Sequence, residues 1–213
     1  MTELAAALRD LDEDKVHELV DAKLDAGVSP IDIIQKCQEG IIAVGELYAS
    51  GQYYLTELMF SGDIMQSVMA KLDPIIASRA AEGKIIGTVV IGTVRGDIHD
   101  IGKNIVVNLL RSNRFKVIDL GVDVHAENFV NMVRKTGAKV LGLSALLNTT
   151  YPEMKNVIDA LKEAGLRERV KVIIGGAVVS EAVREFTGAD AYATDALQGI
   201  EFCKKIYRAC TAD

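Results

Sequence analysis

The sequence predicts an α/β protein in which an N-terminal four-helix bundle precedes a flavodoxin-like, doubly wound parallel sheet of five strands. Two observations support this fold class. Residues 1–83 show only the helical repeat of apolar side chains. Within residues 84–213, short β-branched runs alternate with helical stretches, which indicates successive βαβ units. We therefore expect two domains, 1–83 and 84–213.

Four helical segments can be placed in the first domain from their apolar repeats and their flanking residues. Asp12 and Ser29 are suitable N-caps, and Gly27 and Gly51 suit the ends of two segments. The last repeat should stop near Pro74, because proline removes a helical hydrogen bond. The expected helices cover residues 4–8, 12–27, 29–51 and 58–74.

The second domain contains five candidate strands separated by helical stretches. In a doubly wound sheet, ligands bind beyond the carboxyl ends of the strands, so the informative residues should follow the strands. The strands are expected at 88–94, 116–120, 140–144, 170–174 and 191–193, and the helices are centred on Val107, Met132, Val157, Val183 and Phe202.

Composition excludes several classes of function. A net charge of −6 over 213 residues argues against binding to nucleic acid, which requires clustered Lys and Arg. The N-terminus lacks the pattern of an export signal, and no apolar run is long enough for a membrane span, so we expect a cytoplasmic protein with no membrane partner. Cys37, Cys203 and Cys210 are scattered and form no Cys-x-x-Cys pair, which predicts free thiols rather than a disulfide or a zinc site.

The loop after the first strand carries the pattern Asp97-x-His99-x-x-Gly102. It is not a Walker-type phosphate loop, because five residues separate Gly96 from Gly102 and Asn104 follows the lysine. The dinucleotide fingerprint Gly-x-Gly-x-x-Gly is also absent.

A carboxylate that accepts one ring N–H of a histidine fixes the tautomer and makes the other nitrogen a better metal ligand. Asp97 and His99 have suitable spacing, although a turn histidine that is hydrogen-bonded for structural reasons is the plain alternative. A zinc site would need three or four protein ligands, and His17 and His125 lie far away in the sequence. A single imidazole is enough if the metal brings its other ligands, as cobalt does in a corrin ring.

Residues 96–106, Gly-Asp-Ile-His-Asp-Ile-Gly-Lys-Asn-Ile-Val, resemble the cobalamin-binding signature of corrinoid methyltransferase proteins. Residues 39–48 and 51–58 resemble the helical domain, called the cap, of cobalamin-dependent methionine synthase and of the small corrinoid proteins of methanogens and acetogens. Three later segments resemble other loops of the family, so the resemblance spans essentially the whole chain. They are residues 142–147, 175–177 and 192–196.

The resemblance implies a cobalamin or related corrinoid that binds with its own dimethylbenzimidazole displaced. His99 would then be the lower axial ligand of cobalt, Asp97 would hold His99, and Thr150 would be third in their proton chain. Ser144 and Asn148 would bind the nucleotide tail of the cofactor, although methionine synthase has Thr and Ser where Asn148 and Thr150 stand. The other implied contacts are Gly96, Ile98, Asp100, Gly102 and Leu146, together with Gly175, Gly176 and Ala196, where the tail approaches the backbone.

Four residues of the helical domain align with cap residues of the family. Tyr48, Leu55 and Leu58 correspond to residues that cover the upper, methyl-bearing face of the corrin, and Glu39 to a cap residue near the ring. Periodicity alone would place such apolar side chains in the core of the bundle. A hinge at 81–84 would let the cap move aside.

The implied function is that of a methyl-carrier subunit in one-carbon metabolism, in methanogenesis or acetogenesis, and not of a complete catalyst. The cofactor would alternate between methylcobalamin and cob(I)alamin. The implied partners are a substrate-specific methyltransferase, an acceptor methyltransferase that uses coenzyme M or tetrahydrofolate, and a reductive activase. Similar carriers serve methylamines, methanol, betaines and methoxylated aromatics, with the donor chosen by the partner; among these we expect a methylated amine or a betaine.

Three other hypotheses share part of the pattern. The cobalamin subunit of a radical mutase shares Asp-x-His-x-x-Gly but resembles this chain only in the α/β half. A cobalamin-dependent sensor also pairs a helical bundle with this domain, but it usually has an additional signalling module. A flavodoxin-like module without a cofactor would purify colourless.

Overall fold

The computed structural model describes residues 1–78, 85–176 and 179–209. The chain divides into two compact units, Met1–Ser78, called the helical unit, and Arg79–Asp213, called the α/β unit. The expected hinge at 81–84 lies outside the described residues.

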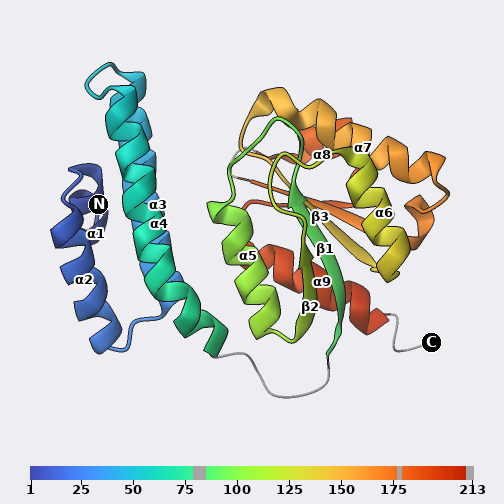
Figure 1. Ribbon diagram of the computed structural model, residues 1–213, viewed down its shortest axis with the longest axis horizontal. Helices are drawn as coiled ribbons and strands as arrows, with labels where there is room; N and C mark the ends of the chain where they lie inside the picture. The colour runs from blue at the N-terminus through green and yellow to red at the C-terminus, as the bar shows by residue number, and fades with distance from the viewer. Residues whose placement is uncertain (79–84, 177–178, 210–213) are drawn as a thin grey trace. The chain divides into compact units, whose positions relative to one another are not determined.

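The helical unit consists of four helices, as predicted (Figure 1). The Asp12 carboxylate accepts a hydrogen bond from the backbone N–H of Lys15, and the Ser29 hydroxyl accepts one from Ile31, so both act as the expected N-caps. The side chains of Val16, Ile33 and other apolar residues are fully buried between the helices. The helices are α1 (Glu3–Arg9), α2 (Glu13–Asp25), α3 (Pro30–Ala49) and α4 (Leu55–Ser78).

The prediction that the last helix ends near Pro74 is wrong, because α4 continues to Ser78. Leu72 and Ile76 are buried on either side of the proline, so packing favours a continuous helix. Pro74 and Ala70 are both exposed, and the Ala70 carbonyl that proline leaves without a helical donor can therefore bond to water.

The α/β unit contains a five-stranded parallel sheet in the order β2-β1-β3-β4-β5, which is the flavodoxin-like order. The prediction of five parallel strands is confirmed, and three of the strands differ from the expected bounds by one residue. Such shifts arise because a strand ends where its neighbour stops pairing, which a single sequence does not show. The strands are β1 (Gly87–Thr93), β2 (Phe115–Asp119), β3 (Val140–Ser144), β4 (Lys171–Gly175) and β5 (Ala191–Ala193).

Helices cover both faces of this sheet (Figure 1). Helices α5 (Ile101–Ser112) and α9 (Ala196–Ala209) pack together on one face. The other face is covered by α6 (Ala126–Thr136), α7 (Tyr151–Glu163) and α8 (Glu181–Thr187). Two 3₁₀ turns, Asn148–Thr150 and Arg167–Arg169, lie on either side of α7 in the sequence.

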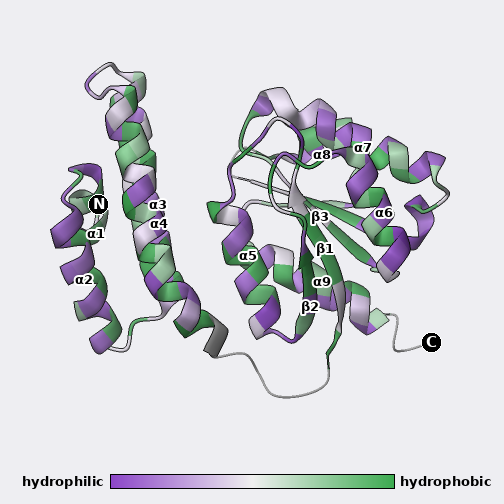
Figure 2. Cartoon of the chain, viewed as in Figure 1, coloured by the Kyte–Doolittle hydropathy of each residue, from purple (hydrophilic) through white to green (hydrophobic). Residues whose placement is uncertain are grey.

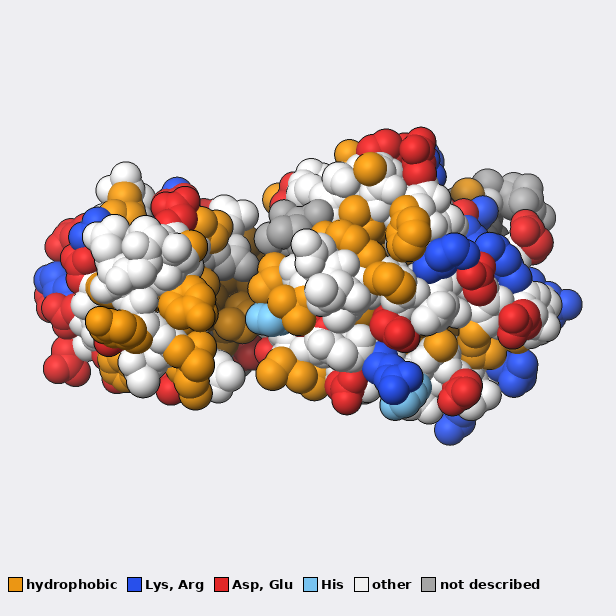
Figure 3. Space-filling model, turned by 90° about the horizontal axis from the view of Figure 1, so that it is seen from above, with side chains coloured by type: hydrophobic (Ala, Val, Ile, Leu, Met, Phe, Trp, Pro, Cys, Tyr) orange, Lys and Arg blue, Asp and Glu red, His pale blue; other side chains and the backbone are white. Residues whose placement is uncertain are grey.

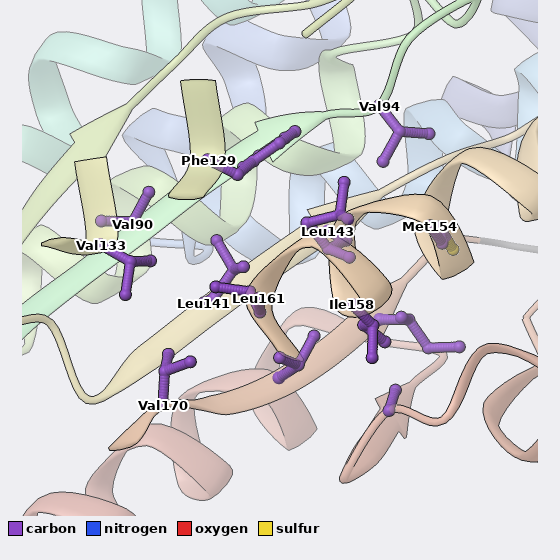
Figure 4. Close-up of a cluster of buried hydrophobic side chains, with 14 of the residues drawn as sticks. Val90, Val94, Phe129, Val133, Leu141, Leu143, Met154, Ile158, Leu161 and Val170 are labelled. Carbon is purple, nitrogen blue, oxygen red and sulfur yellow. The ribbon is translucent and has the colours of Figure 1, made fainter. Parts of the chain in front are cut away.

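The main core of this unit lies between the sheet and α6 and α7. The strands are mostly hydrophobic along their length, whereas the helices alternate hydrophobic and polar faces (Figure 2). Phe129 of α6 and Ile158 of α7 meet Leu141 and Leu143 of β3 in this core (Figure 4). Each such fully buried side chain contributes about 1.5–3 kcal/mol to folding, so the sheet is a rigid support for its loops.

The strand order places a topological switch point at the carboxyl ends of β1 and β3. From β1 the chain goes to β2 on one side, and it then returns to β3 on the other side of β1. The loops after β1 and β3 therefore diverge around a shared opening, where ligands of this fold class bind. The backbone N–H of Val94 donates to the Ser144 carbonyl at 3.1 Å and joins the two loops at their bases.

Cys37 and Cys203 are buried free thiols, as expected, and burial raises the pKa of each to about 12. Cys210 lies outside the described residues. Among the described helices, none has both the length and the apolar character needed to cross a membrane.

Candidate functional site

The site is built around His99 in the loop that joins β1 to α5. The ring Nδ1 of His99 lies 2.7 Å from Oδ1 of Asp97, and the backbone N–H of His99 donates to the same oxygen at 3.0 Å. Asp97 is fully buried, whereas 48% of the His99 side chain is exposed. The Thr93 hydroxyl donates to the His99 carbonyl at 3.0 Å and fixes the backbone. With Nδ1 held by a carboxylate, Nε2 is the ring nitrogen that remains for a metal.

The second carboxylate oxygen of Asp97 is held by the loop after β3. The backbone N–H groups of Leu146 and Leu147 donate to Oδ2 at 2.7 and 3.0 Å. Burial alone would raise the pKa of Asp97, but the N–H groups of Leu147, His99 and Leu146 and the His99 ring stabilise the charged form and lower the pKa to about 2. Asp97 therefore remains a carboxylate at neutral pH.

Thr150 lies beside this carboxylate. Its hydroxyl donates to the Leu147 carbonyl at 2.7 Å, and its oxygen is 3.5 Å from Oδ2 of Asp97. A hydroxyl has only one proton to donate, and here it is donated to the closer acceptor, the Leu147 carbonyl. Its proposed place in a proton chain would therefore require a rotation of this hydroxyl.

The expected tail-binding residues gather at the carboxyl edge of the sheet. Ser144 ends β3, Gly175 ends β4, and Asn148 is exposed at the start of the 3₁₀ turn. Gly176 has a φ of +142°, and a Cβ atom at this position would lie 1.9 Å from the Ala145 carbonyl oxygen. Only glycine allows the two loops to approach this closely. Ala196, also expected here, is the first residue of α9, which follows β5.

The surface near His99 is unusually apolar. Ile98 is 73% exposed, and Leu146, Leu147 and Val122 are also exposed on segments that contact Asp97 or its neighbours. Hydrophobic side chains are visible at the surface of the α/β unit (Figure 3). A flat macrocycle would cover such side chains, so a free imidazole nitrogen, an apolar surround and the close backbone approach at Gly176 together fit a corrinoid.

The other predicted loop residues support the turn. Gly96 has a φ of +79°, a conformation that favours glycine. The Asp100 carboxylate accepts from the Asn104 side chain at 3.1 Å, and Gly102 lies in the first turn of α5. One contact was not anticipated from the sequence: the Asp123 carboxylate accepts from the Gly96 N–H at 2.7 Å. Asp123 belongs to no motif, and only the neighbouring position of β2 in the sheet could have drawn attention to it.

The candidate residues of the helical unit are largely exposed. Tyr48 is 42% and Leu55 is 58% exposed, so the placement of these two in the core by periodicity alone is wrong. Leu58 is partly buried, and Glu39 is exposed and paired with Lys36 at 2.5 Å. Three other large apolar residues near them in the sequence are exposed as well, namely Tyr54, Met59 and Phe60.

The two other histidines belong to no cluster of potential metal ligands among the described residues. His17 is hydrogen-bonded to the Ser67 hydroxyl at 2.9 Å, and His125 precedes α6 without a side-chain cap. In the described part of the chain, no group of three or more His, Cys, Asp or Glu side chains could hold a metal ion. A metal at His99 must therefore bring its other ligands with it.

Comparisons with known proteins agree with this geometry. One B12 binding domain family matches residues 87–201, and a second matches residues 1–73. Dimethylamine corrinoid protein 1 of Methanosarcina acetivorans is 40% identical over 97% of this chain and 96% of its own length. The monomethylamine corrinoid protein of Methanosarcina barkeri is 35% identical, with a TM-score of 0.88 and 96% of both chains covered.

A further solved structure is the methanol:cobalamin methyltransferase complex of Methanosarcina barkeri. The matching chain is 34% identical, with a TM-score of 0.56 over 96% of this chain and 78% of that chain.

Proposed function

This chain belongs to the corrinoid proteins with B12 binding domains, and we propose that it carries methyl groups derived from a methylated amine or a betaine. Its cofactor is cobalamin or a related corrinoid, and its function is that of a corrinoid methyl carrier that works with methyltransferases. The named relatives serve dimethylamine and monomethylamine, which supports an amine as the donor. Both units are matched, which favours a carrier over a radical mutase subunit.

The observation that carries the site assignment is the fixed, half-exposed imidazole of His99. Asp97 holds Nδ1, so Nε2 is the nitrogen with which His99 would hold the cobalt of a corrinoid. When bound, the corrinoid supplies a cobalt centre that accepts a methyl group from one methyltransferase and gives it to another.

The residues around His99 would influence this cobalt centre in two ways: they hold the imidazole ring in position, and they stabilise the proton on its Nδ1. Asp97 would increase the basicity of a coordinating His99 ring through the Nδ1 hydrogen bond. With the imidazole away from a metal, the buried Asp97 carboxylate would still hold Nδ1 and would stabilise a proton on the ring. The backbone N–H groups of Leu146 and Leu147 keep Asp97 ionised throughout. Thr150 would act on this pair if its hydroxyl turned from the Leu147 carbonyl at 2.7 Å to Oδ2 of Asp97 at 3.5 Å.

Three partners follow from this role: a donor methyltransferase, an acceptor methyltransferase that uses coenzyme M or tetrahydrofolate, and a reductive activase. The methanol:cobalamin complex, which contains a chain similar to this one, supports the first of them. Tyr48, Leu55 and Leu58 are proposed to cover the upper face of the corrin, with Glu39 near its edge. The exposure of Tyr48 and Leu55 supports this role, because side chains committed to the bundle core would not be free for a ligand.

The ligand assignment is tested by His99→Ala. The wild-type protein, reconstituted without oxygen and reduced to the cobalt(II) state, should show nitrogen superhyperfine splitting from an axial imidazole in its electron paramagnetic resonance spectrum. His99→Ala should lose this splitting while the helices and sheet remain folded, because His99 is half-exposed. His125→Ala is the matched control and should retain the splitting. The proteins are reconstituted with a corrinoid that lacks the dimethylbenzimidazole base, so that the base cannot replace the imidazole, and unchanged splitting in His99→Ala would then contradict the assignment.

The donor is tested separately with methyltransferases of known specificity. Methyl transfer to this reconstituted chain is measured with an enzyme for dimethylamine, one for a betaine and one for methanol. We expect transfer from the amine or betaine enzyme. Transfer from the methanol enzyme alone would contradict the proposed donor and leave the ligand assignment untouched.

A further inference from the structure

A second set of contacts holds the His99 loop from the side opposite the loop after β3. They come from residues 120–124, which follow β2. The Asp123 carboxylate accepts from the Gly96 N–H at 2.7 Å, and the Asp123 N–H donates to the Asp97 carbonyl at 3.0 Å. The backbones of Thr93 and Val124 are also hydrogen-bonded at 3.0 Å. The loop after β2 thus fixes the backbone of the residues that precede His99.

The start of this loop is held by Asp119, the last residue of β2. Its Oδ1 accepts from the Gly121 N–H at 2.9 Å, and its Oδ2 accepts from the Lys103 ammonium at 2.6 Å. Only 2% of the Lys103 side chain is exposed, and its ammonium also donates to the Asn104 side chain at 2.7 Å. A buried ammonium is costly unless it is paired, so the Lys103–Asp119 ion pair is a fixed connection between α5 and β2.

These contacts reach His99 from both directions along the chain. Asp123 holds Gly96, which lies three residues before His99, and Asp119 holds Lys103, which lies four residues after it. Asp97 is held independently by Leu146 and Leu147. The imidazole is therefore attached to a segment that is fixed at both ends as well as at its carboxylate partner.

Core stability does not account for Asp123. Both Asp123 and Gly96 are exposed, so water could replace their hydrogen bond at little cost. Asp123 also has a φ of +52°, which costs a residue with a side chain about 1 kcal/mol. Asp123 thus has a strained backbone on an exposed turn, and its carboxylate accepts from the backbone of the loop that carries His99. We explain this strain by the backbone geometry that the contact imposes on the His99 loop.

We propose that Asp123 and the Lys103–Asp119 pair are positioning residues that keep His99 aligned for axial ligation of cobalt. This inference rests on the proposed function, because it requires His99 to be the ligand. Asp123 acts through the Gly96 backbone, and the ion pair acts through the first turn of α5 and the start of the loop after β2. None of the three residues needs to touch the corrinoid for this role.

The test compares Asp123→Gly with Asp123→Asn. Glycine and asparagine both tolerate the positive φ of position 123, but only asparagine retains a side-chain oxygen that can accept from the Gly96 N–H. In the reconstituted cobalt(II) protein, Asp123→Gly should weaken imidazole binding to cobalt about tenfold, as other losses of support around a metal ligand do. Asp123→Asn should remain close to the wild type. The readout is the nitrogen splitting in the electron paramagnetic resonance spectrum, with circular dichroism as the check of folding.

A second pair of variants tests the buried Lys103–Asp119 ion pair. These variants also test the positioning role if Asp123→Gly does not fold. Lys103→Met removes the buried ammonium, and Lys155→Met removes a surface ion pair with Asp159 on α7 as the matched control. Lys103→Met should reduce the imidazole-bound fraction, and Lys155→Met should not.

The outcomes separate this inference from the proposed function. Absence of nitrogen splitting in the wild type would refute ligation by His99. Splitting that is present in the wild type and equal in Asp123→Gly and Lys103→Met would overturn the positioning role alone. Equal losses in Asp123→Asn and Asp123→Gly would overturn the role of the Gly96 hydrogen bond.

Discussion

The two units present their candidate cofactor-binding residues in opposite ways. In the α/β unit, the carboxylate that orients His99 is fully buried and accepts backbone hydrogen bonds from two loops. In the helical unit, Tyr48 and Leu55 are exposed apolar side chains near the junction of α3 and α4. The first group is part of the folded framework, whereas the second lies on the surface of a bundle whose core is made by other residues.

This difference has an energetic consequence. Removing a buried acceptor leaves its N–H donors unsatisfied, at about 1–3 kcal/mol for each group. Replacing an exposed apolar side chain usually changes stability by less than about 0.5 kcal/mol. Substitutions at the α/β site should therefore affect folding and ligand binding together, whereas substitutions at the exposed residues of the helical unit should affect binding alone.

The largest effect is expected for Gly176→Ala. The new Cβ would lie 1.9 Å from the Ala145 carbonyl oxygen, at a φ of +142° that only glycine adopts readily. We expect a loss of at least about 3 kcal/mol in the free energy of unfolding, together with weaker corrinoid binding.

Gly188→Ala is the matched control for this change. Gly188 also has positive φ, but its nearest atom to a new Cβ is a flexible Ile158 methyl at 3.9 Å, so about 1 kcal/mol is expected. Urea unfolding and corrinoid titration measure both variants. Equal losses in the two would show that the close approach of the loops is unimportant.

A smaller effect is expected from the titration of Asp97. Its pKa in the folded protein, about 2, is below its ordinary value of 3.8, so its contribution to stability is present above the ordinary pKa and is lost as pH falls toward 2. The shift corresponds to about 2 kcal/mol at neutral pH, of which about half should be lost by about pH 3.

The measurement compares the free energy of unfolding of the wild type and Asp97→Asn from about pH 5 to about pH 3. The advantage of the wild type should shrink as the pH falls. Asp159→Asn is the control: hydrogen bonds from Lys155 and Lys162 also lower the pKa of Asp159, but this carboxylate is exposed to solvent screening, so its pH-dependent difference should be smaller than that of Asp97. A constant difference between the wild type and Asp97→Asn would contradict the buried, ionised state of Asp97.

The smallest effect on stability is expected for Leu55→Gln. Because Leu55 is 58% exposed, the free energy of unfolding should change by less than about 0.5 kcal/mol. Ile64→Ala, at a fully buried position on the same helix, should cost about 2–5 kcal/mol. If Leu55 covers the corrin, Leu55→Gln should also slow methyl transfer. Destabilisation of both variants to the same extent would contradict the position of Leu55 outside the bundle core.

The folding pattern was largely accessible from the sequence because it depends on local periodicity and capping. The four helices, the five strands and the N-caps Asp12 and Ser29 all follow from short-range chemistry. The continuation of α4 past Pro74 was not predicted, because burial of Leu72 and Ile76 outweighs the loss of one helical hydrogen bond. Periodicity alone places Tyr48 in the bundle core, and only the resemblance to the cap domain indicated a role outside it, because a helical repeat does not show which part of a helix its neighbours leave uncovered.

The sequence by itself determined the fold class and singled out Asp97 and His99, since their spacing brings a carboxylate to an imidazole within a single turn. Only the tertiary structure decided how Asp97 is held, because Leu146 and Leu147 reach it from another strand. The same is true of Asp123 and Asp119, whose contacts depend on the position of β2 beside β1. Hydrogen bonds between loops of different strands are set by the order of the sheet, and no local pattern encodes them.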